Sequence, residues 1–225
     1  MSTVAPPSIP VAVPIVTVAD LLHQLGDIPA ERVLWDPRPG TATEADVIRY
    51  VDALDKRLVE LVDGTLVEKP MGYYEGRLGG LIFHYMEDFL EEHDEGLCFA
   101  ADSTLRLAKG LVRLPDVSYV PWSLIPNREL PDEQIASLIP ALAIEVLSPS
   151  NTRAEMARKR HDYFAAGVRL VWQIDPVTRT AEVFTAPDVS FTVPADGTLD
   201  GGDVLPGFRL SLARLFERAG HRRGK

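Results

Sequence analysis

The sequence contains a single cysteine, Cys98, among 225 residues. It therefore cannot form an internal disulfide, and it lacks the cysteines of a Cys-rich zinc site. Its five histidines include no pair at the His-x-x-x-His spacing that places two zinc ligands on one helix face. These shortages count against a zinc-finger protein and against a helical zinc hydrolase.

Long apolar runs are also missing, because no run approaches the ~20 residues of a transmembrane helix. Residues 1–16 are apolar but hold four prolines and no basic region of the kind that begins a signal peptide. We therefore expect a proline-rich extended arm here, and a cytoplasmic protein without a membrane segment.

Basic residues are in the minority, with 23 Lys and Arg against 33 Asp and Glu, so the net charge is −10. This balance excludes a sequence-independent nucleic-acid coat, but it leaves room for a local basic groove on a nucleic-acid enzyme. Hydrophobic content of 46% and charged content of 25% are ordinary globular values. A chain of this length buries roughly 70% of its unfolded surface and needs no structural metal.

The composition along the chain predicts one main domain with additions at both ends. Helix-start signals at Thr17 and at residues 43–46 predict two short helices, over 18–25 and 47–54, in a stretch too rich in proline for a core of its own. The predicted segments are a Pro-rich arm (1–16), a helical N-terminal extension (17–56), the main domain (57–219) and a basic tail (220–225).

Within the main domain, an Asp63-Gly64 pair between two apolar runs predicts a β-hairpin. Apolar residues at 3.6 spacing predict a long helix over 74–92. Further strands are predicted at 103–108, 111–120, 141–147, 168–174 and 180–185, and further helices at 153–166 and 212–219. This order predicts an α/β fold in which helices flank a central mixed sheet. The strand 141–147, apolar on both faces, belongs at its centre.

Glu145 is the first of several charged residues at positions where the pattern expects apolar ones. It lies in the middle of the apolar strand, where a carboxylate is costly unless it is paired or bound to a metal. Alternation puts Ala141 and Ala143 on its face of the strand, and these small residues leave room near the acid. A salt bridge to a neighbouring helix is the alternative explanation.

Asp116 follows Pro115 inside the predicted strand 111–120, on the face of Leu114. A simple interruption of the strand, or a device that protects a sheet edge, is the alternative for this Pro-Asp pair. Glu75 occupies the same helix face as Leu78. The alternative explanation for Glu75 is the helix dipole, which favours an acid at the start of a helix.

Lys159 lies in the apolar stripe of the helix 153–166, between Met156 and Tyr163, and so is predicted to point toward the sheet. The alternatives are a snorkelling lysine or an ion pair with Glu155. Glu155, however, is predicted to form a capping box with Thr152.

Together, Asp116, Glu145, Glu75 and Lys159 are predicted to face one side of the sheet. Carboxylates suit Mg²⁺ or Mn²⁺, with waters completing the coordination. A lysine beside such a metal can orient or deprotonate a water, or neutralise charge that develops on a phosphate. The pattern therefore indicates metal-assisted hydrolysis of phosphodiester bonds.

Several segments, in this order, resemble the Uma2 (DUF820) family. They are LVDGTLVEK, MGYYEGRL, VRLPDVSYV, AIEVLSPSNTRAEMARKRHDYFAAGVRLVWQIDP and DVLPGFRLSLARLF. The resemblance covers roughly residues 17–216. It implies an endonuclease of the PD-(D/E)XK superfamily with a restriction-endonuclease-like core, which is a central mixed sheet flanked by helices.

The resemblance also implies a set of site residues. Pro115-Asp116 matches the PD element, and Glu145 matches the acid of (D/E)XK. The lysine of that element normally lies two residues after the acid, where this sequence has Leu147. Relatives carry it instead on the following helix, and Lys159 matches that position. The acid of the first helix matches Glu75, where many relatives have histidine.

In the implied mechanism, Asp116 and Glu145 hold one Mg²⁺ (or Mn²⁺) with the carbonyl of Val146. Glu75 reaches that metal through water or holds a second one, and Lys159 positions the attacking water. The metal polarises the scissile phosphate. The expected substrate is DNA, and superfamily analogy suggests a homodimer whose two sites address two strands.

Basic residues near these elements are predicted to contact the phosphate backbone: Arg77, Arg113, Arg153, Arg158 and Arg160, together with Arg106 and Lys109. The alternative for the helix 153–160 is an ordinary solvated face. Two other functions stay open. One is an inactive nuclease-like module that binds nucleic acid or a protein; the other is a scaffold whose inward charges are structural ion pairs.

Overall fold

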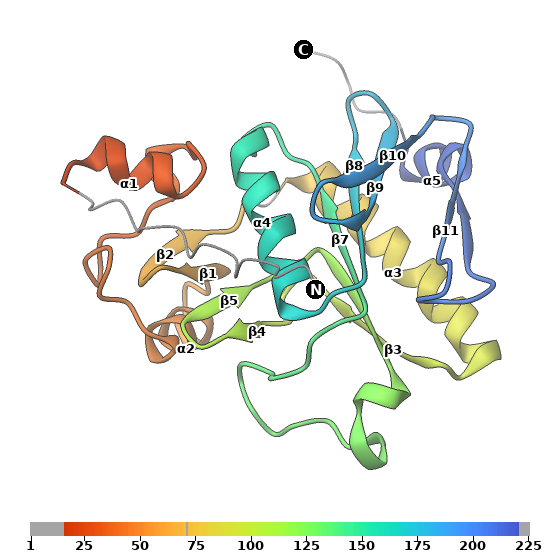
Figure 1. Ribbon diagram of the computed structural model, residues 1–225, viewed down its shortest axis with the longest axis horizontal. Coiled ribbons are helices and arrows are strands. Elements are labelled where there is room, and N and C mark those ends of the chain that lie inside the picture. Colours follow the sequence, from red (N-terminus) through yellow and green to blue (C-terminus); the bar gives the residue numbers. More distant parts are fainter. Residues whose placement is uncertain (1–15, 71, 221–225) are drawn as a thin grey trace, which may run out of the picture.

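The computed structural model describes residues 16–70 and 72–220. The predicted arm up to residue 15 and the tail from residue 221 lie outside the described residues. Figure 1 shows the N-terminal helices and a small sheet on one side, a larger sheet with α3 and α5 on the other, and α4 between them. No helix in the described part is long and apolar enough to cross a membrane.

The two helices predicted in the N-terminal extension are confirmed as α1 (Val18–Gln24) and α2 (Glu44–Asp52). Both begin with a capping box, since the Thr17 hydroxyl accepts a hydrogen bond from the Asp20 amide and the Thr43 amide donates to Asp46. A short 3₁₀ helix, Ala30–Arg32, lies between them. Apolar residues of the extension pack against the small sheet, so the extension shares its core.

The small sheet is antiparallel, with the order β2-β1-β5-β4. Its strands are β1 (Val59–Val62), β2 (Thr65–Glu68), β4 (Leu105–Ala108) and β5 (Leu111–Arg113). The predicted hairpin joins β1 and β2, and both turn residues have positive φ, 48° at Asp63 and 67° at Gly64. Such a turn matches the twist of the two strands.

The large sheet has the order β10-β9-β8-β7-β6-β3. Its strands are β3 (Gly96–Ala100), β6 (Val117–Pro121), β7 (Leu142–Val146), β8 (Leu170–Asp175), β9 (Thr180–Ala186) and β10 (Val189–Val193). Within it, β7 and β8 are parallel and the other pairs are antiparallel. The mixed sheet and the interior position of the strand 141–147 are thus confirmed.

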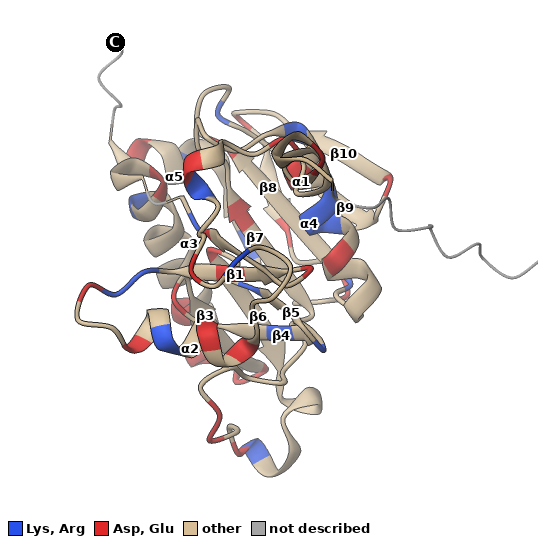
Figure 2. Ribbon diagram, turned by 90° about the vertical axis from the view of Figure 1, so that its left-hand side faces the viewer, with Lys and Arg blue, Asp and Glu red and all other residues tan. Residues whose placement is uncertain are grey.

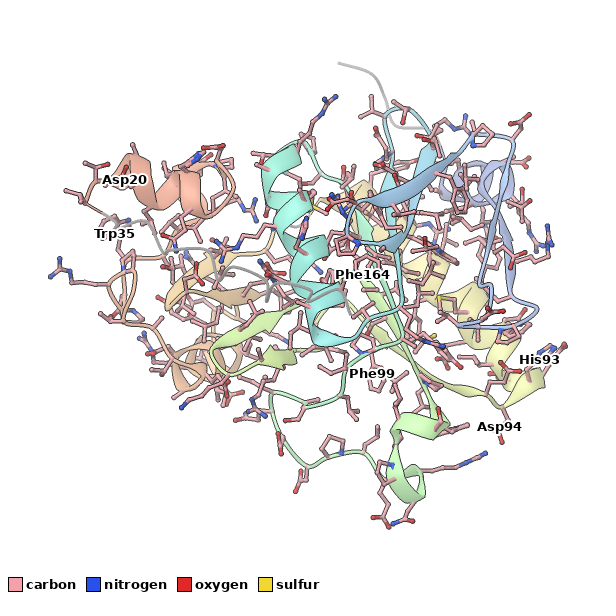
Figure 3. The ribbon with its side chains drawn as sticks, in the orientation of Figure 1. Asp20, Trp35, His93, Asp94, Phe99 and Phe164 are labelled. Carbon is pink, nitrogen blue, oxygen red and sulfur yellow. The ribbon has the colours of Figure 1, made fainter. Side chains whose placement is uncertain are left out.

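Helices cover both faces of the large sheet. On one face, α3 (Tyr73–His93) and α5 (Leu212–Ala219) pack against Ile144 and Trp172, beside the ribbon of β11 (Thr198–Asp200) and β12 (Arg209–Ser211). On the other face, Tyr163 of α4 (Arg153–Ala166) packs with Ala143. Figure 3 labels Phe164 on α4, and His93 and Asp94 at the C-terminal end of α3. Consequently Ile144 of β7 faces α3, whereas Ala143 and Glu145 face α4.

The predicted strand 111–120 is wrong as a single strand. The structure divides it into β5 in the small sheet and β6 in the large sheet, with Leu114–Asp116 between them. Pro115 has no amide hydrogen for a sheet ladder, so the chain leaves one sheet there and enters the other. Asp116 therefore lies at the junction of the two sheets. Strand β3 was not predicted at all.

Candidate active site

Asp116 and Glu145 lie side by side where β6 and β7 pair. Val117 is opposite Ile144 in the register, and one further step brings Asp116 opposite Glu145. The Asp116 amide donates to the Ile144 carbonyl at 2.9 Å, and the Val146 amide donates to Asp116 Oδ2 at 2.7 Å. The two acids predicted as metal ligands are thus held at the ends of neighbouring central strands.

Lys159 meets Glu145 on the α4 side of the sheet. Its Nζ lies 2.7 Å from Glu145 Oε1, and the Tyr163 hydroxyl donates to the same oxygen at 2.6 Å. Lys159 and Tyr163 are four residues apart and so share one helix face. Glu145 is 4% exposed and Lys159 is 3% exposed, so both charges are buried and each has a partner.

Glu60 of β1 extends this arrangement into the small sheet. Its Oε1 lies 3.0 Å from Lys159 Nζ, and its Oε2 lies 2.7 Å from Arg113 Nη1. Arg113 also contacts Asp162 of α4 at 2.5 Å. Glu60 was missed in the sequence, although it gives the same signal as Glu145, an acid inside an apolar strand.

Lys69, just after β2, is a second lysine at the site. Its Nζ lies 2.8 Å from Asp116 Oδ1 and donates to the Leu114 carbonyl at 2.7 Å. It too was missed, although it continues the alternation of Thr65 and Val67 on one face of the hairpin. We call these seven groups the charge cluster: Glu60, Lys69, Arg113, Asp116, Glu145, Lys159 and Asp162.

The predicted site residues do not all lie on one face of the sheet, contrary to expectation. Glu145 and Lys159 meet on the α4 side of the large sheet, whereas Glu75 belongs to α3 on its other side. Asp116 lies beside Glu145 at the sheet junction and also approaches α3, where a Cβ added at Gly79 would be 3.7 Å from its Cβ. Glu75 is buried one turn before Gly79 on α3. The interruption at Pro115 explains the difference, since it places Asp116 at the sheet junction.

The electrostatics follow from burial and from the pairing. Burial raises the pKa of Glu145; the Lys159 ammonium opposes the rise, and the charge of Asp116 adds to it. Burial would lower the pKa of Lys159, but Glu145 and Glu60 outweigh it and raise that pKa. Lys159 therefore stays protonated at neutral pH. In that form it can donate a hydrogen bond or neutralise charge.

The charge cluster holds four carboxylates and three basic side chains, which leaves one negative charge in excess. No hydrogen bond to Glu145 Oε2 is found among the described residues. The described residues contain no group of three or more acidic, His or Cys side chains arranged for a metal. Mg²⁺ is commonly held by one or two carboxylates with several waters, so the pair Asp116 and Glu145 fits such an ion.

The basic residues predicted to bind nucleic acid do not form a single surface. Arg113 is 3% exposed within the charge cluster, so it cannot reach a phosphate at the surface. Arg158 pairs with Asp63 at 2.6 Å, and Arg160 lies over the Phe184 ring. Arg153 lines a cavity of about 830 Å³ at the carboxyl ends of β7 and β8. Arg106 pairs with two glutamates, Glu44 and Glu133.

Comparison with known proteins identifies the family and the fold of the chain. The Uma2 family model, described as "Putative restriction endonuclease", matches residues 49–213. None of the functionally curated proteins compared with the sequence matches it. A solved structure from Anabaena variabilis ATCC 29413, described as a "putative nuclease belonging to DUF820", has the same fold with a TM-score of 0.64. It is 19% identical, and the match covers 72% of this chain and 92% of that chain. By its sequence, the chain belongs to the Uma2 family.

Proposed function

We propose that the protein is an endonuclease that hydrolyses DNA phosphodiester bonds with the help of Mg²⁺ or Mn²⁺. The observation that carries the proposal is the pair Asp116 and Glu145, adjacent at the ends of β6 and β7, with a negative charge in excess. Family membership and the printed description of the solved neighbour support the same class of reaction.

In this proposal, Asp116 and Glu145 hold the cation, with the Val146 carbonyl and Glu75 as further predicted ligands. When bound, such an ion polarises a phosphate oxygen and stabilises the charge that develops on the leaving oxygen. The Tyr163 hydroxyl fixes the orientation of Glu145 by donating to Oε1 at 2.6 Å.

Lys159 has three N–H donors, and two of them are directed at Glu145 and Glu60. In the proposed reaction the third donates to the attacking water or to a phosphate oxygen. Through this donor Lys159 orients the water, with Glu145 and Glu60 holding its ammonium in place. Glu60 acts on the reaction through Lys159 and is a positioning residue.

The test is cleavage of supercoiled plasmid and of a single-stranded circle in Mg²⁺, Mn²⁺ and EDTA. It compares the wild type with Glu145→Gln and with Glu91→Gln as the matched control. Glu91 is an exposed glutamate near the C-terminal end of α3. We expect metal-dependent nicking by the wild type and the control, and a loss of roughly 100-fold or more in Glu145→Gln. Cleavage that persists in Glu145→Gln would contradict the proposal.

A second candidate function is an inactive nuclease-like module that binds nucleic acid or a protein. It is favoured by the ion pairs of Lys69 with Asp116 and of Lys159 with Glu145, which neutralise both acids without a metal. The negative net charge of −10 also favours it. Such a module would bind DNA in a gel shift without cleaving it, and Mg²⁺ or Mn²⁺ would not raise its melting temperature.

A further inference from the structure

A groove of about 510 Å³ lies between α3 and α5, on the side of α3 that faces away from the sheet. Arg77 and His84 of α3 and Arg214 and Arg218 of α5 line it, and Glu217 is the acid that accompanies them. Figure 2 shows α5 packed beside α3, with basic segments where the two helices meet. We call Arg77, Arg214 and Arg218 the groove arginines.

The groove arginines differ from most basic residues of this acidic protein. Within residues 16–70 and 72–220, the majority of lysines and arginines make an ion pair with Asp or Glu. In the same ranges no ion pair is found for any of the three groove arginines. All three are exposed, so their charge is available to a ligand in solution.

Two contacts fix the groove arginines in place. Arg77 Nη2 donates to the carbonyl of Arg218, near the end of α5, at 3.3 Å. The Arg214 guanidinium lies 5.2 Å from the centre of the Tyr85 ring, within the range of a cation–π interaction. A guanidinium carries five N–H donors, so each arginine retains donors for a phosphate. Arginine suits this role because its planar fork matches two phosphate oxygens.

The groove is close to the carboxylate pair. Arg77 lies two residues before Gly79, which contacts Asp116 from the opposite side of the same helix. A helix with its side chains is about 10–12 Å across. The groove and the carboxylate pair are therefore separated by about one helix width.

We propose that the groove arginines bind backbone phosphates of the nucleic acid to one side of the bond that is cut. The inference rests on the proposed nuclease function and adds a binding surface to it. Arg77 was predicted from the sequence as a phosphate contact, whereas Arg214 and Arg218 join it only through the packing of α5 on α3. The groove also explains how a protein with a net charge of −10 can hold a polyanion.

The test measures binding of a fluorescein-labelled 20-base-pair DNA by anisotropy, in EDTA so that nothing is cut. It compares the wild type with Arg77→Gln/Arg214→Gln/Arg218→Gln at several salt concentrations. The matched control is Arg38→Gln/Arg49→Gln/Arg169→Gln, which removes the same charge from exposed positions elsewhere. Melting curves of both variants establish that they fold.

We expect the groove variant to bind at least tenfold more weakly than the control at low salt. Its plot of log K against log salt should also be less steep by about two to three units, since up to three phosphate contacts are lost. Equal affinities for the groove variant and the control would overturn the inference, as would a wild type that binds no DNA in EDTA.

A separate arm adds 10 mM inorganic phosphate at constant ionic strength. Release of the DNA from the wild type and from the control alike, since both keep the groove arginines, would assign the groove to free phosphate and overturn the inference. Because the binding assay needs no cleavage, its result can contradict the groove proposal without contradicting the nuclease proposal, and the reverse also holds. A protein that binds through the groove arginines but never cuts contradicts only the nuclease, whereas one that cuts with unchanged binding in the groove variant contradicts only the groove.

Discussion

The charge cluster and the α3–α5 groove use basic residues in opposite ways. In the charge cluster every basic side chain lies against a carboxylate, and one negative charge is left over. In the groove three arginines accompany a single acid, Glu217, and positive charge is left over. In the charge cluster, ion pairs between the protein's own side chains stabilise the junction of the two sheets. The sign of the unpaired charge in each region then indicates its ligand. The negative excess of the charge cluster favours a cation, and the positive excess of the groove favours a phosphate.

The largest expected effect is that of Arg113→Met on stability. The substitution removes Arg113 from both Glu60 and Asp162 in a buried site and leaves Glu60 with Lys159. Breaking a buried ion pair costs about 3–5 kcal/mol. The control is Arg49→Met, whose pair with Asp36 has side chains 51% and 79% exposed and should contribute about 0–1 kcal/mol. Urea denaturation of both variants measures the difference, and equal losses would contradict the contrast between buried and exposed pairs.

A pH series on Glu60→Gln tests the same pairing. Burial would raise the pKa of Glu60, but Lys159 and Arg113 outweigh it and hold that pKa below the usual 4.5. The charged form therefore stabilises the fold above pH 4.5, and this contribution is lost as the pH falls. We expect Glu60→Gln to lower the free energy of unfolding by about 2 kcal/mol at pH 7 and by less at pH 3.5. A difference that grows on acidification would be inconsistent with this account.

Lys69→Met examines the competition between a lysine and a metal for Asp116. Without metal, the variant should melt a few degrees lower, since about 1 kcal/mol corresponds to roughly 2–4 °C in a chain of this size. With Mn²⁺, its melting temperature should rise more than that of the wild type, because Oδ1 of Asp116 is free of the ammonium. Lys56→Met, which changes an exposed pair with Asp102, is the control. A smaller rise in the Lys69 variant would show that Lys69 supports the cation.

The smallest expected effect is that of Asp63→Asn. The sequence predicted Arg158 as a phosphate contact, but in the structure Asp63 neutralises it at 2.6 Å. Releasing Arg158 should tighten DNA binding by about twofold to threefold and lower the free energy of unfolding by about 0–1 kcal/mol. Anisotropy in EDTA measures the affinity. Weaker binding would indicate that Asp63 orients Arg158 toward the DNA.

The parts of the fold that depend on local signals could be predicted from the sequence. Thr17 and the Thr152–Glu155 box begin their helices as expected, and Asp63-Gly64 forms the turn. An interruption at Pro115 was the alternative interpretation of the strand 111–120, and the structure confirms it. The sequence alone could not decide it, because it depends on β5 and β6 joining different sheets. Strand β3 is short and follows a long helix, and its place is set by pairing with β6, not by its own sequence.

In the candidate site, too, residues with a local sequence signal could be predicted, whereas residues defined by distant contacts could not. Glu145 and Lys159 could be identified because each is a charged residue in an apolar pattern. They are only 14 residues apart in the sequence, and α4 packs Lys159 against β7, the strand that contains Glu145. Arg113 was predicted to contact a phosphate because its buried partner could not be recognised in the sequence. That partner, Glu60, lies 53 residues away on another strand. Lys69 is likewise recognisable as a site residue only once β2 and Asp116 are brought together.

The central claim is that Asp116 and Glu145 form a cation site, and calorimetric titration with Mn²⁺ in the absence of nucleic acid tests it most directly. The account predicts that the wild type and Glu91→Gln bind Mn²⁺ alike, and that Glu145→Gln binds it at least tenfold more weakly while remaining folded. Equal binding by the wild type and Glu145→Gln, or no binding by the wild type, would contradict the account.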